Sequence, residues 1–164
     1  MIMGLSTYTF IHVVISLIGI FSGVVVMFGL LAANRLSTWT AIFLVTTVAT
    51  SLTGFGFPFE HLLPSHIVGA ISLVALAVAI LARYGRHLAG AWRTIYVITA
   101  MIALYLNVFV LVVQSFLKIR ALHALAPTQT EQPFKVAQLV VLIAFVVLTI
   151  FAVKQFRHEG VRAA

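Results

Sequence analysis

The residues best suited to chemistry in this sequence are histidines accompanied by a carboxylate. The 164 residues include six histidines, three acidic residues and no cysteine. Imidazole and carboxylate groups together bind zinc or copper, and two imidazoles on opposed helices can hold a b-type haem. Our candidate ligands for haem b or a divalent metal are the five residues that we expect on one side of a membrane: His12, His61, His66, His123 and Glu60.

The spacing of these histidines leaves two interpretations open. A continuous helix does not bring His61 and His66 onto one face, but a turn broken by Pro64 could do so. The sequence contains no H-x-x-x-H or H-E-x-x-H motif, so the alternative is that these histidines are interfacial. Pro64 and Ser65 also resemble the start of a helix, with Ser65 as its N-cap or in its first turn.

A second group of candidate residues lies along the first long apolar run. His12, Ser16, Gly19 and Gly23 recur at i, i+4, i+7 and i+11, which places them on one helical face. Gly19 and Gly23 form a small-residue motif that lets another helix approach closely. The competing interpretation is that the glycines clear space for a flat cofactor ligated by His12.

Polar residues in later apolar runs form a third group. Hydroxyls in a membrane helix can bond back to a backbone carbonyl and hide their polarity, and an amide can join two helices. The alternative is a polar path for a solute. The candidate lining residues are Ser16, Thr47, Thr50, Asn107 and Gln114. We find no charged residue deep in an apolar run, which argues against a proton-coupled transporter.

The composition identifies the elements that must position these side chains. Hydrophobic residues make up 63% of the chain and charged residues 8%, and the mean hydropathy is +1.19. A water-soluble globule has about a quarter charged residues, so we predict an all-α, polytopic membrane helical bundle. The net charge of +7 comes from clusters at the ends of apolar runs. This pattern favours headgroup contacts and argues against nucleic acid as a partner.

We predict five transmembrane helices in a single integral-membrane domain of residues 1–164, because five runs are long enough to cross a bilayer. The predicted spans are 8–31, 39–57, 65–82, 94–117 and 136–153. Seven Lys and Arg residues fall on one side of these spans and three on the other. Since the richer side faces the cytoplasm, the N-terminus is predicted outside and the C-terminus inside.

The functional predictions are broader. The sequence has no G-x-S-x-G motif, no paired acidic residues and no phosphate loop, which disfavours an enzyme. We predict a small protein of the bacterial inner membrane that acts as a non-enzymatic accessory or interaction subunit. Its partners would be the lipid bilayer and a membrane protein or a second copy of the chain. The alternatives are a haem- or metal-binding electron-transfer protein and a small-solute transporter or channel.

Overall fold

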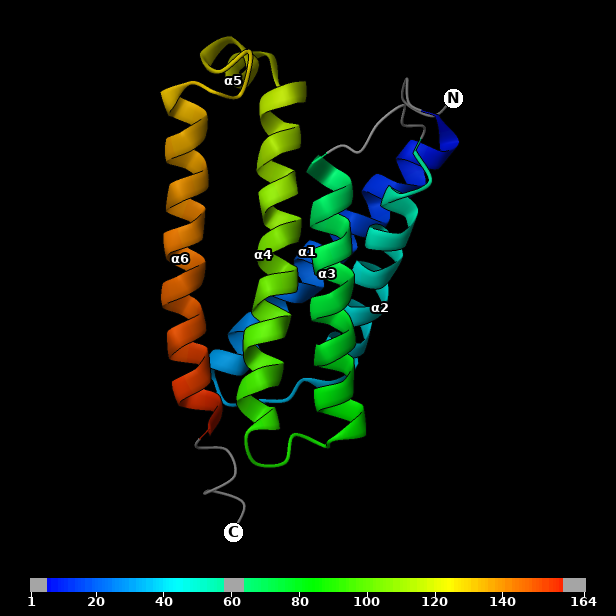
Figure 1. The fold of residues 1–164 in the computed structure, drawn as a ribbon, viewed down its shortest axis with the longest axis vertical. Coiled ribbons are helices and arrows are strands. Elements are labelled where there is room, and N and C mark those ends of the chain that lie inside the picture. The colour runs from blue at the N-terminus through cyan, green and yellow to red at the C-terminus, as the bar shows by residue number, and fades with distance from the viewer. Residues whose placement is uncertain (1–5, 58–63, 158–164) are drawn as a thin grey trace.

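The described part of the chain, residues 6–57 and 64–157 of a computed structural model, is helical and contains no strand (Figure 1). The all-helical fold class is therefore confirmed. The helices are α1 (Thr7–Leu31), α2 (Ser37–Gly54), α3 (Pro64–Ile80), the π-helical turn η1 (Leu81–Gly85), α4 (Trp92–Lys118), α5 (Arg120–Leu125) and α6 (Gln132–Arg157). We call the end of the molecule with the start of α1 the N-terminal end, and the end with residues 32–36 and the close of α6 the C-terminal end.

Four stretches of helix among the described residues are long and apolar enough to cross a membrane. They are Thr7–Leu31, His66–Gly85, Trp92–Lys118 and Gln132–Arg157, with mean hydropathies of 2.2 to 2.9. The predicted span 39–57 corresponds to α2, which does not meet this criterion. Eight of the 18 residues of α2 are Ser or Thr, and their hydroxyls lower its hydropathy. The four helices fit a small membrane protein.

The helix boundaries have local causes. Ser6 caps α1, because its hydroxyl accepts a hydrogen bond from the backbone N–H of Thr9 at 3.1 Å. Helix α3 starts at Pro64, where a missing N–H costs nothing, and Ser65 lies in its first turn. The connection between α4 and α6 contains α5, a short helix rich in Ala and Leu, which are good helix formers.

The long helices that are adjacent in the chain pack together, and α1 also reaches α4 and α6. Figure 1 shows why: α1 is steeply inclined and crosses toward the foot of α6. Much of the buried core therefore lies toward the C-terminal end, where α1, α3, α4 and α6 converge. Its largest fully buried hydrophobic side chains include Leu30, Phe43, Leu76, Tyr96, Leu104 and Phe156.

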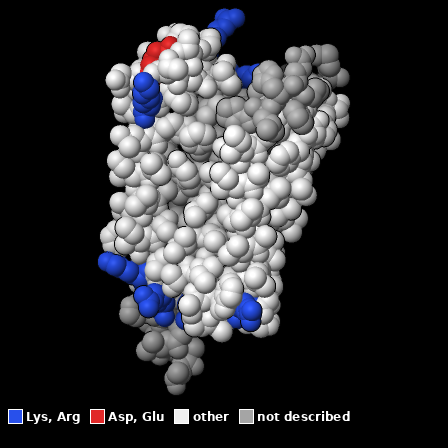
Figure 2. Space-filling view, in the orientation of Figure 1, with Lys and Arg blue, Asp and Glu red and all other residues white. Residues whose placement is uncertain are grey.

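Basic side chains gather at the two ends of the bundle. On the face in Figure 2, Lys and Arg lie above and below a wide band without charge. Six of the described basic residues belong to the C-terminal end: Arg35, Arg83, Arg86, Arg93, Lys154 and Arg157. The N-terminal end carries Lys118, Arg120 and Lys135. The uncharged band has the character expected of a surface that faces lipid tails.

Candidate functional site

His12 is held between α1 and α2 near the N-terminal end. Its Nδ1 lies 2.8 Å from the hydroxyl oxygen of Thr53, which itself donates to the carbonyl of Ala49 at 2.7 Å. The Thr53 hydroxyl has one hydrogen, so when it donates to Ala49 the His12 Nδ1–H is the donor in the contact between His12 and Thr53. The imidazole also meets the Phe57 ring edge to face at 5.0 Å, and Tyr8 donates its hydroxyl hydrogen to the Thr53 carbonyl.

The other described candidate ligands lie on α3 and α5. His66 is buried at the start of α3, with its ring 5.6 Å from that of Phe55, while His123 is exposed on α5. Among the described residues, no three His, Cys, Asp or Glu side chains come together to hold a metal ion. The structure therefore gives no support to a site built from His12, His66 and His123. Residues predicted on the same side of the membrane can still be too far apart to bind one ion. Glu60 and His61 lie outside the described residues.

The centre of the bundle contains a small polar contact between three helices. The Asn107 amide nitrogen on α4 lies 3.4 Å from the Thr47 hydroxyl on α2 and donates to it. A Cβ atom at Gly19 on α1 would lie 3.2 Å from the Thr47 hydroxyl and 3.3 Å from that of Thr46. The amide thus faces neighbouring helices, which spares it the cost of exposure to lipid.

Gly23 lies one turn further along α1, where packing is tighter. A Cβ atom there would be 2.5 Å from Leu104 Cδ1 and 2.9 Å from the Phe43 ring. Phe43 and Leu104 are each about 1% exposed. The space beside Gly23, considered above for a flat cofactor, is filled by side chains of α2 and α4.

The remaining lining candidates do not gather around Asn107. Ser16 donates to the carbonyl of Val13 at 2.8 Å, and Thr50 donates to that of Thr46 at 2.8 Å. Gln114 lies on the exposed surface of α4. Each hydroxyl bonds back to its own helix, which hides its polarity without a solute.

Sequence reasoning missed two glutamines that join the C-terminal half of α4 to the chain around α6. Gln129 donates to the carbonyl of Val113 at 2.9 Å, and Gln138 donates to that of Phe109 at 3.2 Å. The Gln138 amide oxygen is buried without a hydrogen-bond partner. The only sequence signal was their position near the start of the last apolar run.

Glu131 stabilises the start of α6. The N–H and hydroxyl of Thr128 donate to one carboxylate oxygen at 3.2 and 2.9 Å, and the N–H of Thr130 donates to the other at 3.0 Å. Desolvation favours the neutral carboxyl, but these hydrogen bonds together outweigh it and lower the pKa of Glu131 below its ordinary value. These hydrogen bonds close the turn of residues 128–131 that leads into α6, whose first residue is Gln132.

Sequence reasoning also missed the burial of Arg83, which it had treated only as a topology signal. Arg83 lies in η1 and is 8% exposed. Its Nη2 donates to the carbonyl of Arg35 and the hydroxyl of Ser37, both at 3.2 Å. Leu76, Ala79 and Arg83 recur at i, i+3 and i+7, so the helical period could have predicted that Arg83 points inward.

Comparison of this chain with protein-family models, curated protein sequences and solved structures finds no match. The chemistry of the chain must therefore be argued from its own residues.

Proposed function

We propose that α2 crosses the membrane together with the four apolar helices, which gives five spans. Three contacts support this, because they pair α1 and α2 antiparallel over residues 43–53 of α2: Gly23 with Phe43, Gly19 with Thr47, and His12 with Thr53. Helix α2 also lies level with α3, from the Ser51–Ser72 hydroxyl contact to the Arg83–Ser37 contact. The hydroxyls of α2 that return to backbone carbonyls reduce the cost of placing it in lipid.

The proposed orientation has the C-terminal end in the cytoplasm. Six of the described basic residues lie at this end and three at the other, and in the sequence Arg162 comes after the last span. An excess of Lys and Arg in short segments beside the spans marks the cytoplasmic side. Five spans with this bias place the N-terminus outside.

We further propose that the protein is a non-enzymatic interaction subunit whose partner packs on α6. The main support for this proposal is that few residues of α6 are covered by the other helices. In its most apolar 18-residue window 6% of the residues are buried, against 33–39% in the other three candidate spans. Helix α6 packs on α4 and on the far end of α1. Figure 1 shows it at the edge of the bundle. The glycine face of α1 is already taken by α2 and α4.

The surface between α4 and α6 also contains a groove in which side chains of another helix can pack. A groove of about 300 Å³ runs between the two helices, and its lining includes Ile98, Ile102, Tyr105, Leu142 and Val146. Helix association in membranes depends on close van der Waals contact rather than on hydrophobicity. A transmembrane helix of another protein, or of a second copy, gains such contacts by placing side chains in this groove.

Site-specific photo-crosslinking in native membranes tests this interaction. A photoreactive residue at Ile143, which is 54% exposed on α6, should give an adduct of defined mass with a protein partner. The matched control is Val74, which is 66% exposed on α3 and should crosslink only to lipid. Lipid adducts alone at both positions would contradict the proposed interaction, and the adduct's mass separates a second copy from another protein.

A further inference from the structure

The guanidinium of Arg83 is a buried charge whose described contacts are all with neutral groups. Nη2 meets the Arg35 carbonyl and the Ser37 hydroxyl, and Cζ lies 5.4 Å from the centre of the Tyr96 ring. Nη1 is buried and has no hydrogen-bond partner. Glu131, the one acidic side chain in the part of the chain that the structure describes, belongs to the opposite end. A buried charge without an anion is costly, so the site calls for a negative group from outside the described chain.

An apolar groove between α2 and α3 leads to this charge. It has a volume of about 390 Å³, and it is lined by Ala41, Leu44, Val45, Val48, Ile80 and Tyr84. Arg83 reaches from η1 to Ser37, and these two residues lie about one turn beyond Ile80 and Ala41 toward the C-terminal end. Tyr84 lines the groove and its ring centre is 5.8 Å from Arg83 Cζ. The groove ends at Tyr84, beside Arg83, so it is apolar along its length and has a positive charge next to that end.

We propose that this site binds an anionic phospholipid of the leaflet at the C-terminal end. An acyl chain lies in the groove, and the phosphate lies at the end of the groove, where the positive charge of Arg83 attracts it. The planar guanidinium suits phosphate, and basic pockets between transmembrane helices are typical sites for anionic headgroups. Arg83 lies near the end of the apolar stretch His66–Gly85, which is the depth expected for lipid headgroups. This inference requires the bundle to span the membrane but does not depend on a partner at α6.

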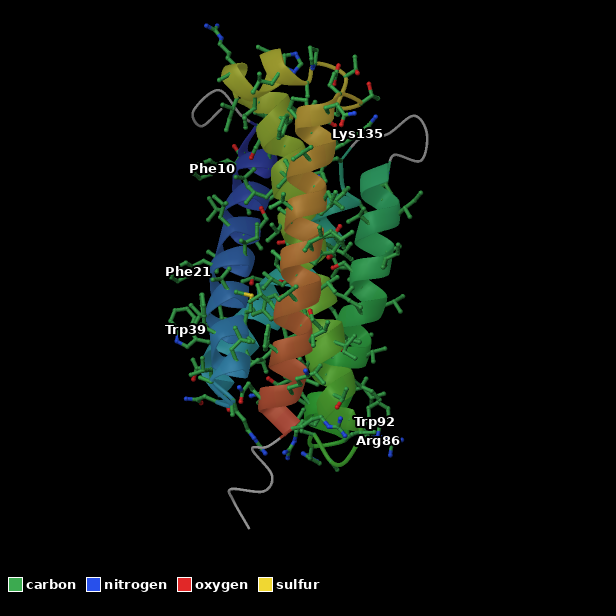
Figure 3. The ribbon with its side chains drawn as sticks, turned by 90° about the vertical axis from the view of Figure 1, so that its left-hand side faces the viewer. Phe10, Phe21, Trp39, Arg86, Trp92 and Lys135 are labelled. Atoms are coloured by element: carbon green, nitrogen blue, oxygen red, sulfur yellow. The ribbon has the colours of Figure 1, made fainter. Side chains whose placement is uncertain are left out.

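Neighbouring residues at this end match the headgroup level. Arg86 lies over the Trp92 ring at 5.2 Å, and Figure 3 shows the two side chains together at the C-terminal end. Tryptophan rings prefer the membrane interface, and Arg86 adds a second positive charge there. Arg83 lies within a π-helical turn, and such turns are frequent at functional sites.

Native mass spectrometry of the full chain in mild detergent tests the site. Phosphatidylglycerol should be retained about tenfold more strongly than phosphatidylcholine of the same chain length, equivalent to about 1.4 kcal/mol. Arg83→Gln should abolish this preference. Arg120→Gln, which removes an exposed charge at the other end, should leave it unchanged.

Three further measurements test the proposal even if Arg83→Gln does not fold. Ala41→Phe changes an exposed residue of the groove wall, and it should weaken phosphatidylglycerol binding several-fold with Arg83 intact. Glu159→Gln should leave the preference intact, which would exclude that carboxylate as the necessary counter-ion. Equal retention of the two lipids by the natural chain would overturn the proposal. Stabilisation by inorganic phosphate equal to that by phosphatidylglycerol would also overturn it, because the groove would then have no role.

Discussion

Replacing Gly23 by alanine tests the tightest junction of the bundle, where α1 meets α2 and α4. The new Cβ atom would lie 2.5 Å from Leu104 Cδ1 and 2.9 Å from two carbons of the Phe43 ring. Both side chains are about 1% exposed and have little free space to move into. Overpacking of this kind costs about 1–3 kcal/mol. We expect no compensating gain in helix propensity, because α1 stays helical in the membrane even when its packing is lost.

Gly19→Ala is the matched control. Its Cβ atom would lie 3.2 to 3.6 Å from Thr47, Thr46 and Asn107 side-chain atoms, so small shifts suffice and the loss should stay below about 1 kcal/mol. The assay is reversible unfolding in mixed micelles, followed by circular dichroism and tryptophan fluorescence. A Gly23→Ala protein as stable as Gly19→Ala would refute the packing described at this junction.

A double-mutant cycle locates the cost at one contact. Leu104→Ala removes the atom nearest the new methyl group and by itself leaves a cavity that costs about 2–5 kcal/mol. Combined with Gly23→Ala, the loss should be clearly smaller than the sum of the two single losses, because the alanine methyl then has room. Strict additivity would mean that residues 23 and 104 do not touch.

Three other perturbations follow from the described contacts. Asn107→Leu should cost only about 0.6 kcal/mol in the same assay, the usual size of a hydrogen bond between membrane helices, and a Thr47→Val change should add little to it. Gly56→Ala should loosen the contact between the start of α1 and the end of α2, since its Cβ atom would collide with the Tyr8 hydroxyl, and cleavage by a protease near residue 56 should speed up. The lowered pKa of Glu131 means that its stabilisation of α6 is present above the ordinary value of 4.5 and is lost as the pH falls through the lowered pKa. Hydrogen exchange at the start of α6 should therefore quicken in acid, and Glu131→Gln should remove that pH dependence.

The apolar runs predicted the long helices well because a bilayer imposes a length on any helix that crosses it. Their neighbours could not be predicted, since residues facing lipid and residues facing protein are both apolar. Gly19 and Gly23 indicated a packed face, but only the structure shows that Thr47, Phe43 and Leu104 occupy it.

Polar residues were harder to predict for a different reason. Sequence can assign a histidine to a side of the membrane, yet His66 and His123 lie on different helices with different surroundings. Arg83 was interpreted from its charge alone, whereas its spacing from Leu76 and Ala79 turns it inward. In α2 the Ser and Thr content depresses hydropathy although several hydroxyls bond to their own helix.

The central claim is that α2 spans the membrane, which places its two ends on opposite sides. The chain has no cysteine, so single cysteines can be introduced and labelled in intact cells with a membrane-impermeant maleimide. Cysteines at Phe55 and Thr128 should react from outside, and those at Asn34 and Ala89 should react only after the membrane is permeabilised. Labelling of Asn34 and Phe55 from the same side would contradict the five-span account.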